Sequence, residues 1–124
     1  MNQYRNTEKD IHERIYKFII NCFRDVVNKI SKSPANTPII SQLSSSLTSM
    51  GANDQEADAA GSNKDFISKY QIVKKETKET RYWLKFVKDS KLINPIIVDP
   101  YFTESGEILL VVSKIILNSK GKKF

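Results

Sequence analysis

A heptad seam between residues 66 and 87 constrains the fold of this chain more than any other feature. Its members alternate between steps of four and three residues: Phe66, Tyr70, Val73, Thr77, Thr80, Leu84 and Val87. This spacing puts them all on one side of an α-helix, and such a seam must be covered by other helices. We therefore predict a helix over residues 63–90, roughly 40 Å long at 1.5 Å per residue, inside a helical bundle.

Three further segments, residues 8–31, 38–60 and 104–119, show apolar side chains at helical steps. The first segment begins with a capping box formed by Thr7 and Asp10. The second keeps its apolar stripe through a run of serines, which indicates a helix with close backbone packing. Four amphipathic helices with short early connections predict an all-α fold, an antiparallel up-and-down four-helix bundle.

The chain has 124 residues, which suits a single domain over residues 1–124. Gly61 and Ser62 form a short joint that makes the second and third helices antiparallel neighbours. The stretch 91–102 is apolar but contains Pro95 and Pro100. We therefore predict a loop there, which covers the bundle end left open by the short last helix.

Composition limits the compartment and the kind of partner. No apolar stretch approaches the ~20 residues that a membrane span needs, and the polar N-terminus does not resemble a secretory signal. The single cysteine allows no internal disulfide, so we expect a cytoplasmic protein without membrane contact. The net charge of +6 is concentrated in residues 64–91, which carry nine basic and four acidic groups. A basic balance favours anionic partners if the charge lies on one surface.

The sequence offers no catalytic constellation. His12 and Cys22 are the only histidine and cysteine, and ten helical residues place them ~80° apart around the axis, so they cannot share a metal ion. Cys22 lies on the apolar stripe and is most simply a small core residue. Neither a nucleophile elbow nor a phosphate-binding glycine loop is present. We expect no enzyme activity, no metal and no cofactor.

An acidic group near the end of the second helix allows two interpretations. Asp54 falls on the core stripe, where an unpaired charge would be costly, and Glu56 and Asp58 follow it. The third helix offers cations as partners: Lys74, Lys75, Lys78 and Arg81. A structural polar network that fixes helix register is the favoured interpretation, because nothing supplies a third ligand or an acid–base partner. The alternative is a cation or substrate site in a small enzyme.

The third helix carries the best functional signal, a basic stripe beside its seam. Five cations step four, three, four and three residues apart: Lys74, Lys78, Arg81, Lys85 and Lys88. Phosphates require cations that are presented together, and a rigid helix does this at little entropic cost. We name these residues as the candidate nucleic-acid site. An ordinary solvated face, partly neutralised by nearby acids, is the competing interpretation.

Trp83 and Phe86 flank the seam on the side opposite the basic stripe. On a monomer they would form an exposed apolar patch, and such patches usually mark interfaces. We predict a subunit contact there in preference to base stacking, since stacking surfaces normally interleave aromatic rings with cations.

Several residues resemble the family of 23S rRNA intervening-sequence proteins, whose relatives include accessory proteins of diversity-generating retroelements. The resemblance rests on an Asn-x-x-Glu pair, an acidic–Phe pair about ten residues later and a following glutamate: Asn53 and Glu56, Asp65 and Phe66, and Glu79. Their spacing needs no gaps. From these positions and the core stripe we predict a structural polar cluster of Asn53, Asp54, Glu56 and Glu79.

The resemblance implies a four-helix bundle that assembles into a homopentameric ring with a positively charged surface and has no enzyme activity. It also implies genes that lie within rRNA or beside reverse transcriptases. The leading hypothesis is a non-enzymatic oligomeric bundle that binds RNA or DNA, most simply as an RNA accessory protein. The alternative is a protein-interaction scaffold for a reverse transcriptase or another partner, without direct nucleic-acid binding.

Overall fold

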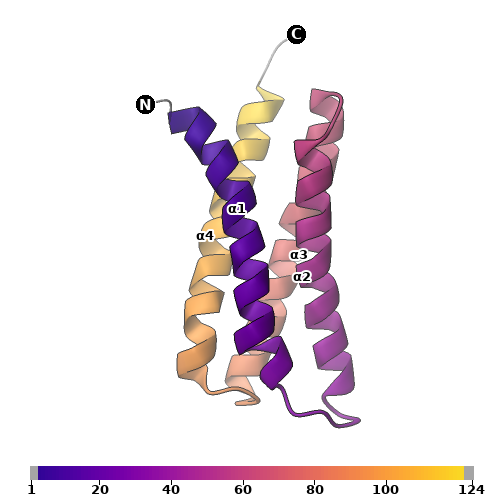
Figure 1. The fold of residues 1–124 in the computed structure, drawn as a ribbon, viewed down its shortest axis with the longest axis vertical. Coiled ribbons are helices and arrows are strands. Elements are labelled where there is room, and N and C mark those ends of the chain that lie inside the picture. Colours follow the sequence, from indigo (N-terminus) through magenta and orange to yellow (C-terminus); the bar gives the residue numbers. More distant parts are fainter. Residues whose placement is uncertain (1–2, 122–124) are drawn as a thin grey trace.

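A computed structural model describes the backbone of residues 3–121 and the side chains of residues 11–121. Within that range the chain contains no strand, and a short 3₁₀ turn follows the first of its four helices. The elements are α1 (Gln3–Asp25), η1 (Val27–Lys29), α2 (Thr37–Asp58), α3 (Asn63–Asp89) and α4 (Pro95–Lys120). The predicted all-α four-helix bundle is confirmed (Figure 1). The capping-box side chains predicted near residue 7 lie outside the described side chains.

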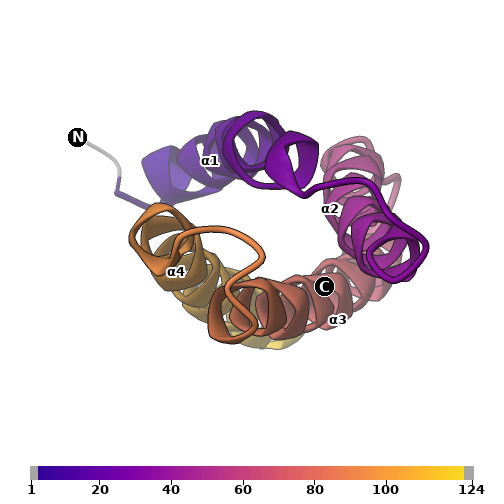
Figure 2. The same cartoon turned by 90° about the horizontal axis from the view of Figure 1, so that it is seen from below.

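The helices form a ring in chain order (Figure 2). Each helix packs against its neighbour in the chain, and α1 closes the ring against α4. The most extensive contact joins α2 to α3, which the four-residue joint over residues 59–62 holds antiparallel. In the described part of the chain, no helix combines the length and apolar character that a membrane crossing requires.

The heptad seam of α3 lies in the interior, as predicted. Phe66 is half-buried, and the other members are buried: Tyr70, Val73, Thr77, Thr80, Leu84 and Val87. The two threonines bury hydroxyl groups without a penalty because each has a partner. Thr77 Oγ1 donates to the carbonyl of Val73 at 2.7 Å, and Thr80 Oγ1 donates to Oγ of Ser46 on α2 at 2.8 Å.

The close packing predicted for the small residues of α2 is seen where α1 crosses Gly51. A Cβ atom at Gly51 would lie 2.9 Å from Cδ1 of Ile19, so the missing side chain leaves room for α1. Cys22 is fully buried in α1, as expected of a small core residue. Large, fully buried side chains from all four helices complete the core, among them Ile15, Leu43, Leu47, Leu84 and Ile108.

The predicted loop over residues 91–102 is wrong, because α4 already begins at Pro95. Oδ1 of Asn94 caps the helix by accepting from the Ile96 amide at 3.0 Å. Pro95 occupies the first turn, where no amide proton is needed. Pro100 costs one helical hydrogen bond but does not end the helix. The turn is confined to residues 90–94, with Lys91 in the left-handed region at φ 61°.

The contact between α1 and α4 includes a carboxylate whose pKa is well below its ordinary value. Arg24 donates to Asp25 at 2.8 Å, and the Tyr101 hydroxyl of α4 donates to the other carboxylate oxygen. The hydrogen bond from Arg24, followed by that from Tyr101, lowers the pKa of Asp25 from 3.8 to about 2. Burial, together with the bond to Asp25, raises the pKa of Tyr101 to about 12.

We expect Asp25→Asn to destabilise the fold near neutral pH and to have no effect in strong acid. Because the pKa is lower in the folded chain, the carboxylate contributes stability above its unfolded value of 3.8 and loses it as pH falls through about 2. Urea unfolding of both proteins across this range should show their stabilities converging between pH 3.8 and about 2. A difference that stays constant down to the lower limit would contradict the assignment.

Candidate functional site

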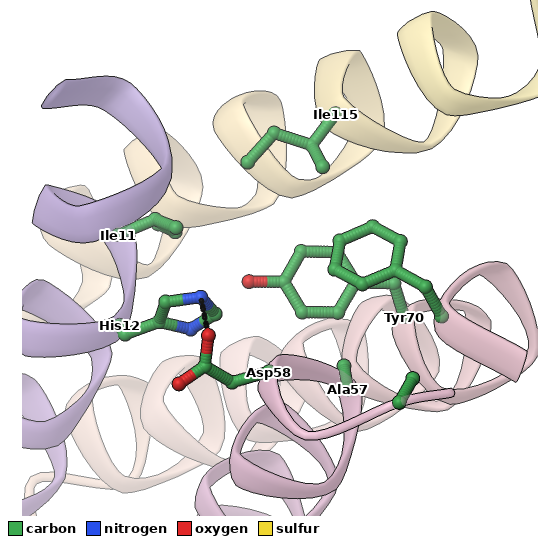
Figure 3. Close-up of a pocket in the computed structure, with 8 residues that line it drawn as sticks. Ile11, His12, Ala57, Asp58, Tyr70 and Ile115 are labelled. Carbon is green, nitrogen blue, oxygen red and sulfur yellow. Dashed lines mark ion pairs between the residues drawn. The ribbon is translucent and has the colours of Figure 1, made fainter. Parts of the chain in front are cut away.

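Side chains from all four helices line a small pocket near the joint between α2 and α3 (Figure 3). The pocket has a volume of about 190 Å³ and is lined by Ile11, His12, Ala57, Asp58, Ala60, Phe66, Tyr70 and Ile115. Phe66 and Tyr70 stack with their ring centroids 4.7 Å apart. His12 reaches across from α1 towards Asp58 and the Tyr70 hydroxyl.

A buried carboxylate beside this pocket joins three helices. Asp54 of α2 is only 1% exposed, and its Oδ1 lies 2.7 Å from Nδ1 of His12 and 2.7 Å from the Tyr70 hydroxyl. Since a carboxylate accepts hydrogen bonds, both of these groups donate to it. His12 also places Nε2 3.3 Å from Oδ1 of Asp58. One histidine of α1 therefore bridges two carboxylates of α2, and α3 contributes the tyrosine.

The partners predicted for Asp54 were wrong: the structure pairs it with His12 and Tyr70 rather than with the lysines and arginine of α3. Because α2 and α3 are antiparallel, Asp54 near the end of α2 lies beside Tyr70 near the start of α3. Lys74 and the cations after it follow Tyr70 by at least one helical turn. His12 was missed because it follows Ile11 at the edge of the α1 stripe, where sequence spacing alone does not show which helix it faces.

The other predicted members of the polar cluster do not gather around Asp54. Asn53 donates to the Ser49 carbonyl of its own helix at 2.9 Å. Glu56 is exposed and lies 2.8 Å from Nζ of Lys69, and this hydrogen bond raises the pKa of Lys69. Glu79 is half-buried on α3. The interior polar group therefore consists of His12, Asp54 and Tyr70, with Asp58 at the surface, and we call it the histidine–aspartate group.

The histidine–aspartate group connects three helices through hydrogen bonds and an ion pair. The pocket lining includes no serine, cysteine or lysine that could act as a nucleophile. Among the described residues, no three side chains of the metal-binding types gather closely enough to hold an ion. Cys22 is buried, and burial raises the pKa of its thiol to about 12, which removes thiolate reactivity at neutral pH. The group links α1 to α2 and α3.

The structure divides the predicted basic stripe of α3 into two sets. Arg81 and Lys88 are half-buried against Phe102 of α4, with the guanidinium carbon and the ammonium nitrogen 4.2 and 5.1 Å from the ring centroid. Arg81 also donates to Ser105 at 3.2 Å, and Lys88 pairs with Asp99 at 3.1 Å. These two cations stabilise the contact between α3 and α4.

The remaining cations of the stripe differ in exposure. Lys78 and Lys85 remain at the surface, Lys74 is half-buried, and Lys75, which lies outside the predicted stripe, is also exposed. Lys85 lies 2.8 Å from Asp89, and this hydrogen bond raises the pKa of Lys85. We call Lys75, Lys78 and Lys85 the outer lysines. They share the solvent-facing side of one rigid helix over about 15 Å at helical rise.

Aromatic side chains lie on the same outer side of α3. Tyr82 is 58% exposed and Phe86 is 38% exposed, whereas Trp83 is half-buried and packs against the core. Trp83 and Phe86 are in contact, with ring centroids 5.8 Å apart, but of the predicted exposed pair only Phe86 is exposed. Tyr82 was missed, although its position four residues after Lys78 and seven after Lys75 was a readable signal of interleaving.

Comparison with known proteins gives the family. Residues 7–114 match the family model of the 23S rRNA-intervening sequence proteins. The chain belongs to this family. A solved structure from the S23 ribosomal protein family of Bacteroides thetaiotaomicron, a protein of unknown function, is similar to this chain with a TM-score of 0.76 and 30% identity. The match covers 90% of this chain and 98% of that one. No curated protein matches the sequence.

Exposed apolar side chains mark two further faces of this 23S rRNA-intervening sequence protein. On α4, Ile96, Leu110 and Leu117 are 79%, 67% and 69% exposed and repeat at multiples of seven residues. On α1, Tyr16 and Ile20 are 62% and 49% exposed and lie one helical turn apart. Apolar side chains aligned along a helix surface are typical of protein contact sites.

Proposed function

We propose that this member of the 23S rRNA-intervening sequence family is a non-enzymatic accessory protein that binds RNA through the outer lysines and acts as a homo-oligomer. The observation that carries the proposal is the exposure of Lys75, Lys78 and Lys85 along one side of α3. Each cation that meets a phosphate releases condensed counterions, which favours binding. Because the helix already fixes the spacing of these charges, little backbone entropy is lost when they bind.

Two different apolar faces support the oligomeric part of the proposal. The exposed residues of α4 and those of α1 belong to different helices, and contact between unlike faces of identical subunits can close into a ring. A homopentameric ring is the assembly that the family resemblance implies. In such a ring the outer lysines of several subunits would add to one positive surface, which strengthens binding to a long anion.

The test is charge reversal at the outer lysines, Lys75→Glu, Lys78→Glu and Lys85→Glu together. We expect affinity for structured RNA to fall at least tenfold and the slope of log affinity against log salt to become shallower by about two to three, since each lost phosphate contact contributes ~0.7–0.9. Fluorescence anisotropy with labelled RNA and duplex DNA at low and physiological salt measures both quantities. Arg81 is left unchanged, because it packs against Phe102.

The matched control reverses three exposed lysines of α1 and the segment that follows it, Lys17→Glu, Lys29→Glu and Lys32→Glu. This variant has the same net charge as the test variant, so it isolates the position of the charges from their sum. The proposal requires the control to bind more tightly than the test variant, with circular dichroism showing both folded. Equal affinities for both variants would show that α3 is not the binding face.

A second candidate function is a protein-interaction scaffold for a reverse transcriptase or another protein. The exposure of Phe86 beside Trp83 favours it. In that case Trp83→Ala with Phe86→Ala should lower the oligomer mass in light scattering or abolish capture of the partner, while the outer-lysine variant should not. An unchanged mass together with a retained partner would exclude this candidate.

A further inference from the structure

We infer that Tyr82 and Phe86 form a platform on which an unpaired base stacks, so that the nucleic acid bound at α3 is single-stranded. This inference rests on the proposed function and names the ligand class of the same surface. It assigns Phe86 to nucleic acid rather than to the predicted subunit contact. It also gives a role to Tyr82, the most exposed aromatic side chain of α3.

The two rings border a hollow on the surface of α3. The hollow has a volume of about 330 Å³ and is lined by Tyr82, Lys85, Phe86, Asp89 and Ser90. Tyr82 and Phe86 are one helical turn apart and therefore lie on the same side of the helix. Ring faces and a lysine thus meet in one depression, which is the combination that holds a base together with its phosphate.

Trp83 holds both rings in place from beneath. Its ring meets that of Tyr82 edge-on at 4.8 Å between centroids and that of Phe86 at 5.8 Å. Trp83 itself packs against the buried core, so it is fixed by the fold. A platform supported in this way loses little side-chain freedom when a base arrives, and low ordering cost favours binding.

Two lysines lie beside the platform. Lys78 lies one turn before Tyr82, and Lys85 is part of the hollow itself. Lys85 is paired with Asp89, but the two side chains are 62% and 55% exposed. An exposed pair of this kind contributes little, so Lys85 can leave Asp89 for a phosphate at small cost.

This arrangement favours a single strand over both a duplex and a protein partner. In a duplex the faces of the bases are covered by their neighbours, and only unpaired bases offer a face to an aromatic ring. The outer lysines alone would accept either form, so selectivity comes from the rings. Protein interfaces are depleted in lysine, whereas this patch is bordered by lysines along the helix.

The test compares binding of a short oligouridine and of an RNA duplex of equal length by the full chain carrying Tyr82→Ala and Phe86→Ala. We expect affinity for the single strand to fall tenfold or more, the scale of a lost base–aromatic stack. Affinity for the duplex should stay the same, and the salt slope should not change, because stacking releases no counterions. Ile97→Ala removes a 45% exposed apolar side chain from α4, outside the two proposed contact faces, and should leave both affinities unaltered. Tyr82→Phe with Phe86→Tyr keeps both rings and should bind like the unchanged protein.

The outcomes separate this inference from the function on which it rests. Equal loss of single strand and duplex, or no loss of either while the outer-lysine variant binds weakly, would overturn the stacking platform and leave nucleic-acid binding by α3 intact. Absence of binding to any nucleic acid at physiological salt would overturn both. A reduced oligomer mass in light scattering for the double alanine variant would assign the patch to a protein contact and refute the inference.

Discussion

Alanine in place of Asp54 is expected to lower the free energy of unfolding by about 3 kcal/mol. The carboxylate is 1% exposed and accepts from His12 and Tyr70, both at 2.7 Å. Its removal leaves the buried tyrosine hydroxyl without that acceptor and takes one of two carboxylates from the histidine. Removing one member of a buried hydrogen-bond network costs more than losing an exposed bond. Urea unfolding followed by circular dichroism measures the effect.

Asp58→Ala is the matched control, because Asp58 lies one helical turn further along α2 and contacts the same histidine. Its side chain is 60% exposed and lies 3.3 Å from His12, so we expect a loss under about 1 kcal/mol. Tyr70→Phe removes only the hydroxyl from the group and should cost an intermediate amount, about 1.5–3 kcal/mol. Equal effects of Asp54→Ala and Asp58→Ala would show that burial of Asp54 does not govern the contribution of the histidine–aspartate group.

Leu47→Ala is expected to cost about 2–5 kcal/mol, because it leaves a cavity at the centre of the bundle. Leu47 is fully buried on α2, and the close packing of the surrounding helices limits their collapse into the space. Ile97→Ala truncates an apolar side chain on α4 that is 45% exposed and lies outside the proposed contact faces, and it should cost under about 1 kcal/mol. Thermal and urea unfolding of the two variants give the comparison. A loss as large for Ile97 as for Leu47 would show that burial of Leu47 does not govern the cost of its truncation.

The architecture was predictable from sequence because its signals are local. The heptad seam of α3 is read from spacing alone, and five of its buried side chains follow Tyr70 at steps of three and four residues. The joint at Gly61 and Ser62 was equally readable, since Ser62 caps α3 by accepting from the Asp65 amide at 3.1 Å. A helix with a regular apolar spacing and its own capping residues can be predicted without knowing which helices pack against it.

The start of α4 and the partners of Asp54 were not predictable by the same means. Pro95 and Pro100 both have low helix propensity, so local sequence preferences argue against a helix here. The cap from Asn94 and the burial of Val98 nevertheless stabilise the helix by more than the one hydrogen bond that is lost. The bond from His12 to Asp54 joins residues 42 positions apart and depends on how α1 is rotated in the ring. Helical spacing gives the faces of each helix but not the rotation of one helix against another.

The candidate nucleic-acid interface was predictable only in part. The basic character of α3 was clear from composition, but the predicted stripe of cations included both exposed residues and residues that pack against α4. Arg81 and Lys88 contact Phe102 of α4, and this contact depends on how the two helices pack. The sequence spacing already places Tyr82 among the outer lysines. Predicting this surface also required knowing that no other helix covers this side of α3.

The ring order of the helices has a consequence for how the chain reaches its fold. Each helix packs on the one before it in the sequence, so most contacts can form without closing long loops. Folding that begins with local pairs is fast, and helical bundles of this topology fold in roughly microseconds to milliseconds. The α2–α3 hairpin, with the most extensive contact and the shortest joint, is the natural first unit. The docking of α1 against α4 closes the ring and carries the entropic cost of joining the most distant parts of the chain.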